Sequence, residues 1–169
     1  MNDATTKLKD GLRRAIQTEA DGYQFYTMAS QTTKDPKGKQ TFKILAAEEM
    51  KHLDFLKSQY KSVNDTGAID AKLRLGDQHD FSKDPIFSDE IRNRIGDAQF
   101  EMSALSIGMQ LELSSINYYK EQAEQSDNPD VAAFYYELAD WEKIHYEALE
   151  RQQEMLKEDF WSKGGFAPF

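Results

Sequence analysis

The chain contains no cysteine among its 169 residues. This absence excludes disulfide bonds, cysteine-ligated zinc sites, iron–sulfur clusters and a four-cysteine iron site. It fits a reducing compartment, and we expect the protein to be cytoplasmic. Histidine is almost as scarce, with three residues, so any histidine chemistry rests on very few positions.

Positive charge is also in short supply. The chain has 21 lysine and arginine residues against 30 aspartate and glutamate residues, for a formal net charge of −9. A nucleic-acid-binding protein needs a basic face, so we expect no nucleic-acid partner. No apolar run approaches the roughly 18 residues that a membrane-spanning helix needs. Residues 1–9 lack the apolar segment of a secretory signal, so we expect no membrane association.

Apolar residues recur at intervals of three and four along four long stretches, which predicts amphipathic helices. We expect these helices at residues 5–31, from Asp35-Pro36 onward, at 97–125, and from Asn128-Pro129 onward. Asp or Asn directly before Pro is typical of a helix N-cap followed by the first helical residue. The length suits one domain, residues 1–169, so the sequence predicts an all-α four-helix bundle.

Two further segments differ from the helices in composition. Residues 62–96 carry Gly67, Gly76 and Pro85 among many charges, and are too long for a plain hairpin loop. We expect a crossover along the bundle, with a short helix after Ser88. Residues 158–169 are rich in aromatic residues and glycine. They are predicted to form a tail that covers the bundle or a second copy of the chain; the alternative is a docking peptide.

The most informative pattern is a triplet that occurs twice. Glu19, Glu49 and His52 recur 93 residues later as Glu112, Glu142 and His145. An ungapped superposition of the two halves matches further identical pairs, among them Gln17/Gln110, Tyr26/Tyr119, Pro36/Pro129, Leu45/Leu138 and Leu56/Leu149. The chain therefore contains two related helical hairpins.

Hairpin geometry places each triplet at one height. Residues 19 and 49 are equally far from residue 34 in the first turn, and residues 112 and 142 are equally far from residue 127 in the second. In an antiparallel helix pair, such residues lie side by side, about 20 Å from the turn. The two triplets are thus expected to meet near the middle of the bundle.

These residues interrupt apolar stripes, which indicates a metal site. On the second helix Glu49 and His52 lie between Leu45 and Leu56, and their i,i+3 spacing puts them on one face. Four buried carboxylates would repel one another at a cost of several kcal/mol, whereas two divalent cations would balance them. A lone Glu from each of two helices plus Glu-x-x-His from the other two is the ligand set of di-iron bundles. The alternative is a pair of surface His–Glu contacts.

Three other positions need assignment. Glu48 also lies near His52 in sequence, but the repeat aligns it with Trp141, so we expect it to be solvated or to lie behind the ligands. Tyr26 and Tyr119 each follow a lone Glu by seven residues; they are either core aromatics or hydrogen-bond donors to ligand carboxylates that assist electron transfer. His79 lies in a polar segment and is expected to be a solvated loop residue.

On these motifs the chain resembles the rubrerythrin branch of the ferritin-like superfamily. The resemblance rests on Glu19 with Tyr26, Glu112 with Tyr119, and the runs 49–52 and 142–145. It implies a four-helix bundle with a long crossover, a non-haem di-iron centre, and reduction of hydrogen peroxide or oxidation of ferrous iron with dioxygen. It also implies a homodimer or a larger homo-oligomer.

The chain departs from the resemblance in two ways. Without cysteine it has no rubredoxin domain, so electrons must come from ferrous iron or from an external donor such as a separate rubredoxin-like protein. Ser115 stands where rubrerythrins carry another Glu, which leaves a more symmetric site, like the ferroxidase centre of ferritins.

We therefore expect two iron ions per chain, with manganese or zinc able to bind in vitro. By analogy, Glu49 and Glu142 bridge the ions, Glu19 and Glu112 are terminal, and each histidine binds one ion. The alternatives are an iron-storage or detoxification protein, and a bundle in which the metal serves only to stabilise an interaction module.

Overall fold

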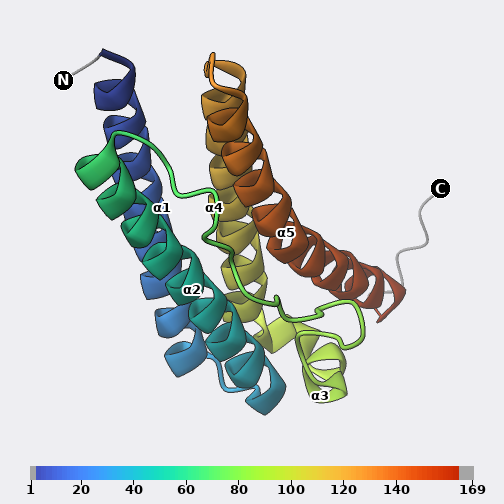
Figure 1. Cartoon of the computed structure of the whole chain (residues 1–169). Helices are drawn as coiled ribbons and strands as arrows, with labels where there is room; N and C mark the ends of the chain where they lie inside the picture. Colours follow the sequence, from blue (N-terminus) through green and yellow to red (C-terminus); the bar gives the residue numbers. More distant parts are fainter. Residues whose placement is uncertain (1–2, 164–169) are drawn as a thin grey trace.

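Four long helices dominate the computed structural model, which describes residues 3–163 (Figure 1). In chain order the elements are α1 (Asp3–Thr32), α2 (Pro36–Thr66), α3 (Asp89–Asn93), the 3₁₀ helix η1 (Ile95–Asp97), α4 (Gln99–Glu124) and α5 (Pro129–Lys163). α1 packs along α2 and α4 packs along α5, so the molecule consists of two helical hairpins, and the main contact between them is α1 with α4. The predicted all-α bundle of two hairpins is confirmed.

Both hairpins turn at the predicted caps. Asp35 has extended backbone angles, and its Oδ1 accepts a hydrogen bond from the Gly38 backbone N–H at 2.7 Å. In the second hairpin, Oδ1 of Asn128 accepts from the backbone N–H of Asp130 at 2.9 Å. A proline follows each cap, where its missing N–H costs nothing.

Two predicted boundaries were wrong. α2 continues past Ser62 to Thr66 and ends only at Gly67, whose φ of 83° lets its N–H reach the carbonyl of Val63 at 3.0 Å. α5 includes residues 158–163, which were expected to lie in a tail. Contacts stabilise this end of α5: Leu156, just before it, is fully buried, and Asp159 pairs with Arg92 of α3. Residues 164–169 of the predicted tail lie outside the described residues.

The crossover runs the length of the bundle from the end of α2 to α3 (Figure 1). Two buried glutamines of the repeat, 93 residues apart, bind its two ends. Gln59 exchanges hydrogen bonds with the backbone of Asp70, and Oε1 of Gln152 accepts from the backbone N–H of Phe87 at 3.1 Å. The short helix predicted after Ser88 is present as α3.

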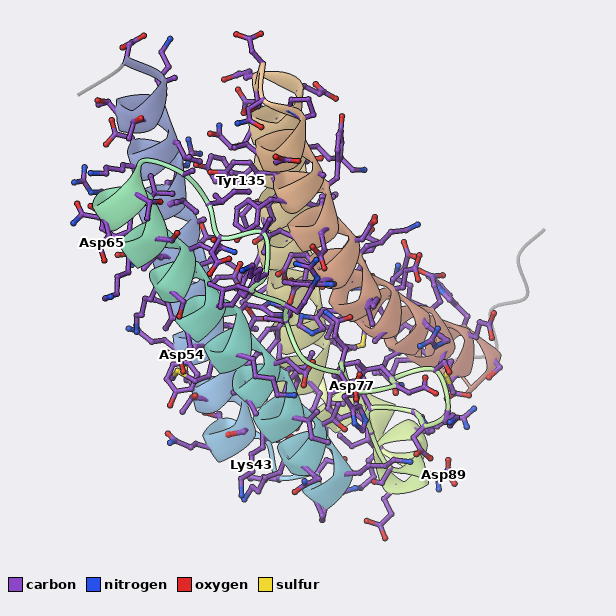
Figure 2. All side chains as sticks on the ribbon, viewed as in Figure 1. Lys43, Asp54, Asp65, Asp77, Asp89 and Tyr135 are labelled. Carbon is purple, nitrogen blue, oxygen red and sulfur yellow. The ribbon has the colours of Figure 1, made fainter. Side chains whose placement is uncertain are left out.

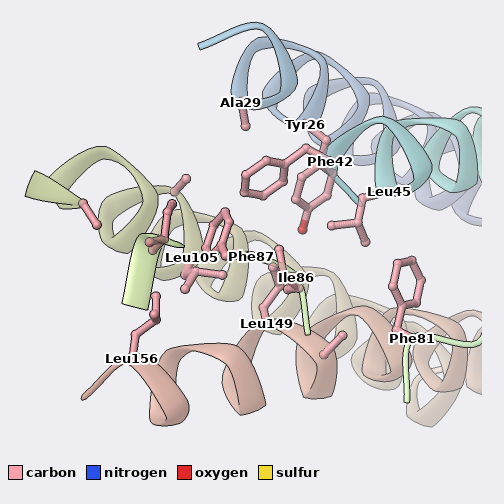
Figure 3. Close-up of a cluster of buried hydrophobic side chains, with 14 of the residues drawn as sticks. Tyr26, Ala29, Phe42, Leu45, Phe81, Ile86, Phe87, Leu105, Leu149 and Leu156 are labelled. Atoms are coloured by element: carbon pink, nitrogen blue, oxygen red, sulfur yellow. The ribbon is translucent and has the colours of Figure 1, made fainter. Parts of the chain in front are cut away.

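Two apolar clusters fill the interior, one on each side of the bundle's middle. The first contains Phe81, Ile86 and Phe87 of the crossover among side chains from all four long helices (Figure 3). The second surrounds Tyr119 and Tyr135, and Figure 2 shows Tyr135 pointing inward. Many residues of the apolar stripes that predicted the helices are buried, including Leu12, Phe42, Leu45, Leu56, Leu105, Leu138 and Leu149. Between residues 3 and 163, no helix is long and apolar enough to cross a membrane.

Asp35 also ties the hairpin turn to α3, because its side chain accepts hydrogen bonds from the backbone N–H and the hydroxyl of Ser88. We expect Asp35→Ala to lower the free energy of unfolding by about 2–3 kcal/mol, because the helix cap and the hydrogen bonds from Ser88 are lost together. The matched variant Asn128→Ala removes a cap alone and should cost about 1 kcal/mol. Urea unfolding followed by circular dichroism measures both; equal losses would show that the tie to Ser88 contributes nothing.

Candidate metal centre

Six polar side chains meet between the two apolar clusters. They are Glu19 of α1, Glu49 and His52 of α2, Glu112 of α4, and Glu142 and His145 of α5, and each is at most 3% exposed. The structure thus brings together all six residues that the doubled triplet predicts. Burial of this many ionisable groups at one height excludes the alternative of surface His–Glu pairs.

The six residues form two overlapping groups of potential ligands. One group consists of Glu19, Glu49, His52 and Glu142; the other consists of Glu49, Glu112, Glu142 and His145. Within each group, one ligand atom per residue lies within 4.8 Å of all the others. Glu49 and Glu142 belong to both groups, which is the arrangement that two neighbouring ions with shared carboxylates require.

Distances within the groups suit a metal ion. Nδ1 of His52 lies 3.2 Å from Oε2 of Glu19 and 2.9 Å from Oε1 of Glu142. Nδ1 of His145 lies 3.0 Å from Oε1 of Glu49. An ion that holds its ligands at about 2.0–2.2 Å separates neighbouring ligand atoms by about 3.0–3.5 Å. The observed spacing is close to this value.

Several of these atoms lack a partner within the protein. Among the described residues, Oε1 of Glu49, Oε1 of Glu142 and Nδ1 of His145 have no hydrogen bond. The 2.9 Å approach between His52 and Glu142 lacks hydrogen-bond geometry. Buried polar atoms are nearly always satisfied, so the unpaired donor atoms fit a bound cation.

The electrostatics show the same demand for positive charge. Burial raises the pKa of Glu49 well above its usual range, with Glu142 adding to the rise, and burial likewise raises the pKa of Glu112 to about 8. Burial would also raise the pKa of Glu142, but His52 and His145 outweigh it and hold that pKa well below its usual range. The cluster therefore recruits protons unless cations balance its carboxylates.

Tyr26 and Tyr119 hold two of the carboxylates. Both are fully buried, and each hydroxyl donates to the lone Glu of the other hairpin: Tyr26 to Glu112, and Tyr119 to Glu19. Of the two roles that the sequence left open, the structure shows the hydrogen bond to a carboxylate. The crossed pairing links the hairpins through the site itself.

Glu48 and His79 lie beside the cluster rather than in it. Of the two alternatives for Glu48, solvation is excluded, because the residue is 3% exposed, and a place behind the ligands remains; Glu48 accepts a hydrogen bond from Lys51 at 2.7 Å and belongs to neither ligand group. The repeat therefore selected the correct register, with Glu49 facing inward. His79 is exposed in the crossover, as expected, and its ring contacts Phe81.

Sequence reasoning missed three residues that shape the site. A Cβ at Gly22 would lie 3.0 Å from Oε2 of Glu49, so this glycine makes room for the carboxylate. Rings of Trp141 and Phe81 pack against His52 and His145, respectively. The repeat contained a signal for Gly22, because the residue 93 positions later, Ser115, is also small. Ser115 is buried and bonds to the carbonyl of Leu111, so it supplies no additional carboxylate.

A four-helix bundle with two Glu-x-x-His pairs and two lone glutamates at its centre has the architecture of a ferritin-like carboxylate-bridged metal protein. The family model for rubrerythrin matches residues 10–153, which include all six clustered residues, and the chain belongs to this family. Members of the family typically bind iron. Neither a search of curated proteins nor one of solved structures finds a match.

The sharing of Glu49 and Glu142 predicts unequal losses of metal. Glu49→Gln or Glu142→Gln should abolish binding at both positions, whereas Glu19→Gln or Glu112→Gln should leave about one ion per chain. Glu48→Gln is the matched control and should retain full binding, because Glu48 lies outside both groups. Anaerobic titration with ferrous iron and elemental analysis give the stoichiometry. Equal losses in all four site variants would contradict the shared arrangement.

The tyrosine hydroxyls are expected to affect affinity rather than stoichiometry. Tyr119→Phe and Tyr26→Phe should each weaken metal binding by about 10–100-fold, because a supporting hydrogen bond to Glu19 or Glu112 is lost. Tyr135→Phe is the control: Tyr135 stacks on Tyr119, but its hydroxyl has no partner among the described residues. Competition with a chelator of known affinity measures the effect. An equal loss in Tyr135→Phe would assign it to packing.

Proposed function

We propose that the protein is a non-haem di-iron oxidoreductase that reduces hydrogen peroxide or oxidises ferrous iron with dioxygen. The observation that carries this proposal is the pair of carboxylates, Glu49 and Glu142, shared by two ligand groups. A purely structural metal site needs one closed ligand set, whereas two ligand groups with shared carboxylates would hold a pair of ions that supplies two electrons to an oxidant.

Each ligand has a role in this proposal. Glu49 and Glu142 would contribute to holding both ions. Glu19 and His52 complete one position, and the second triplet's Glu112 and His145 complete the other. Four carboxylates balance two divalent cations, and neutral imidazoles add no charge. Oxygen ligands with imidazole suit iron and manganese, and zinc can bind in vitro.

When bound, two ferrous ions would supply the two electrons that convert hydrogen peroxide, with two protons, into two molecules of water. The protein's own residues prepare the site for this chemistry. Tyr26 and Tyr119 fix the orientation of the terminal carboxylates across the hairpins. The apolar clusters on either side exclude bulk water, which strengthens every electrostatic interaction within.

Ser115 favours the oxidation of ferrous iron with dioxygen over the reduction of hydrogen peroxide. With a serine in place of another carboxylate, the two positions have matching ligand sets of one terminal Glu, one His and two shared Glu residues. This symmetry supports a ferroxidase, in which ferrous iron is itself the reductant. For peroxide reduction, a separate one-electron donor, such as a rubredoxin-like protein, must restore the centre, because the chain has no cysteine.

Stopped-flow mixing tests the proposal. Protein loaded anaerobically with two ferrous ions per chain should oxidise them much faster than free ferrous iron when mixed with hydrogen peroxide or dioxygen, and the faster oxidant identifies the reaction. Glu142→Gln should reduce the rate to that of free iron, while Glu48→Gln should not change it, because only Glu142 belongs to the ligand groups. Failure of both oxidants to accelerate oxidation would overturn the proposal.

The oligomeric state of the protein distinguishes an enzyme from an iron-storage protein. We propose a homodimer, and mass measurement in solution tests it. A dimer that retains about two irons per chain after addition of excess iron and dioxygen supports an enzyme. A closed shell that retains many more would favour iron storage, and loss of metal without loss of cellular function would favour an interaction module.

A further inference from the structure

The two histidines of the centre have different aromatic neighbours. The Trp141 ring stacks on His52, with ring centroids 5.5 Å apart and an interplanar angle of 27°. The Phe81 ring meets His145 edge-on, at 5.6 Å and 88°. The ligand groups match closely, whereas these aromatic neighbours do not.

Trp141 connects the buried centre to the surface. It lies on α5 directly before Glu142 and is partly exposed, while His52 beneath it is fully buried. Phe55 packs edge-on against the same indole at 5.6 Å and holds it over the imidazole. Tyr26 and Tyr119 donate hydrogen bonds to the carboxylates but are fully buried, so neither makes contact with a molecule in solution.

The redox chemistry of the side chains distinguishes Trp141 from Phe81. Indole is among the most readily oxidised side chains, and it can lose an electron without first losing a proton. A phenylalanine, such as the one beside His145, cannot be oxidised under comparable conditions. Within residues 3–163, the stacked Trp141–His52 pair therefore provides a redox-active ring contact between a ligand and a partly exposed side chain, whereas the Phe81–His145 contact does not.

We propose that Trp141 is an electron relay between a one-electron reductant in solution and the His52 side of the centre. This inference rests on the proposed function. Dioxygen takes up four electrons and four protons to form two molecules of water, which is two electrons more than a ferrous pair holds. Trp141 supplies each remaining electron in turn; each time, the resulting indole radical cation takes one electron back from the reductant.

The chain contains an internal control, because it has only one other tryptophan. Trp161 lies on the same helix but 20 residues further along, about 30 Å away along the axis. It is 56% exposed and contacts Phe160 rather than any residue of the cluster. Non-specific oxidation follows exposure and should mark Trp161 first, whereas a relay should mark Trp141.

The experiment mixes ferrous-loaded protein with dioxygen in the absence of a reductant, with ascorbate added in a parallel sample. Absorbance follows iron oxidation, freeze-quench electron paramagnetic resonance detects radicals, and peptide mass mapping locates oxidised tryptophan. Wild type and Trp161→Phe should give a tryptophan radical and oxidation products at Trp141, and ascorbate should suppress both. Trp141→Phe should lose the radical, and Trp141→Tyr should restore an oxidisable residue and give a tyrosyl radical.

The outcomes distinguish failure of the relay from failure of the proposed function. If iron is oxidised rapidly but the radical persists in Trp141→Phe, the relay is wrong and the proposed function stands. The same holds if no radical forms, if wild type gives only a tyrosyl radical, or if Trp161 is marked in preference. If dioxygen does not accelerate iron oxidation even in wild type, the relay fails; the proposed function fails with it only when hydrogen peroxide does not accelerate the oxidation either. Mapping the wild-type protein needs no variant, so a folding defect in Trp141→Phe cannot decide the result.

Discussion

Burial of four carboxylates in the middle of an apolar bundle is the constraint on which the rest of this structure depends. Such a cluster is stable only when positive charge enters it, and the raised pKa values of Glu49 and Glu112 show how strong that demand is. His52 and His145 meet part of it by holding Glu142 ionised. Divalent cations would meet it fully, so the same feature that opposes folding of the bare chain creates affinity for metal.

The two related hairpins are joined to each other at the buried carboxylates. Each tyrosine of the repeat donates to the carboxylate of the opposite hairpin, so neither hairpin can complete its own half. The repeated, buried glutamines act in a comparable way on the crossover, because Gln59 and Gln152 bind its opposite ends. Two copies of one motif thereby become a single bundle whose centre and covering segment both join the hairpins.

The two halves differ in the residues that surround the ligands. Where one half places Glu48, paired with a lysine, the other places Trp141, stacked on His52. The crossover, which has no counterpart in the repeat, contributes Phe81 against His145. The two ligand groups therefore share their ligand chemistry but differ in the aromatic ring that packs against each histidine.

The sequence by itself determined the helices, their caps, the register of Glu49 over Glu48, and the six residues at the centre. It could do so because helical periodicity and a 93-residue repeat are local or pairwise patterns. The boundaries at Gly67 and Lys163 were misjudged, since packing on neighbouring segments decides how far a helix extends.

Only the tertiary structure decided which partners lie behind the ligands. The crossed tyrosine bonds, the room that Gly22 leaves for Glu49, and the ring of Trp141 on His52 all join different helices. Spacing along one helix states which face a residue occupies, but not which residue of another helix meets it. That choice depends on the rotation and offset of packed helices, which side-chain packing over the whole bundle sets.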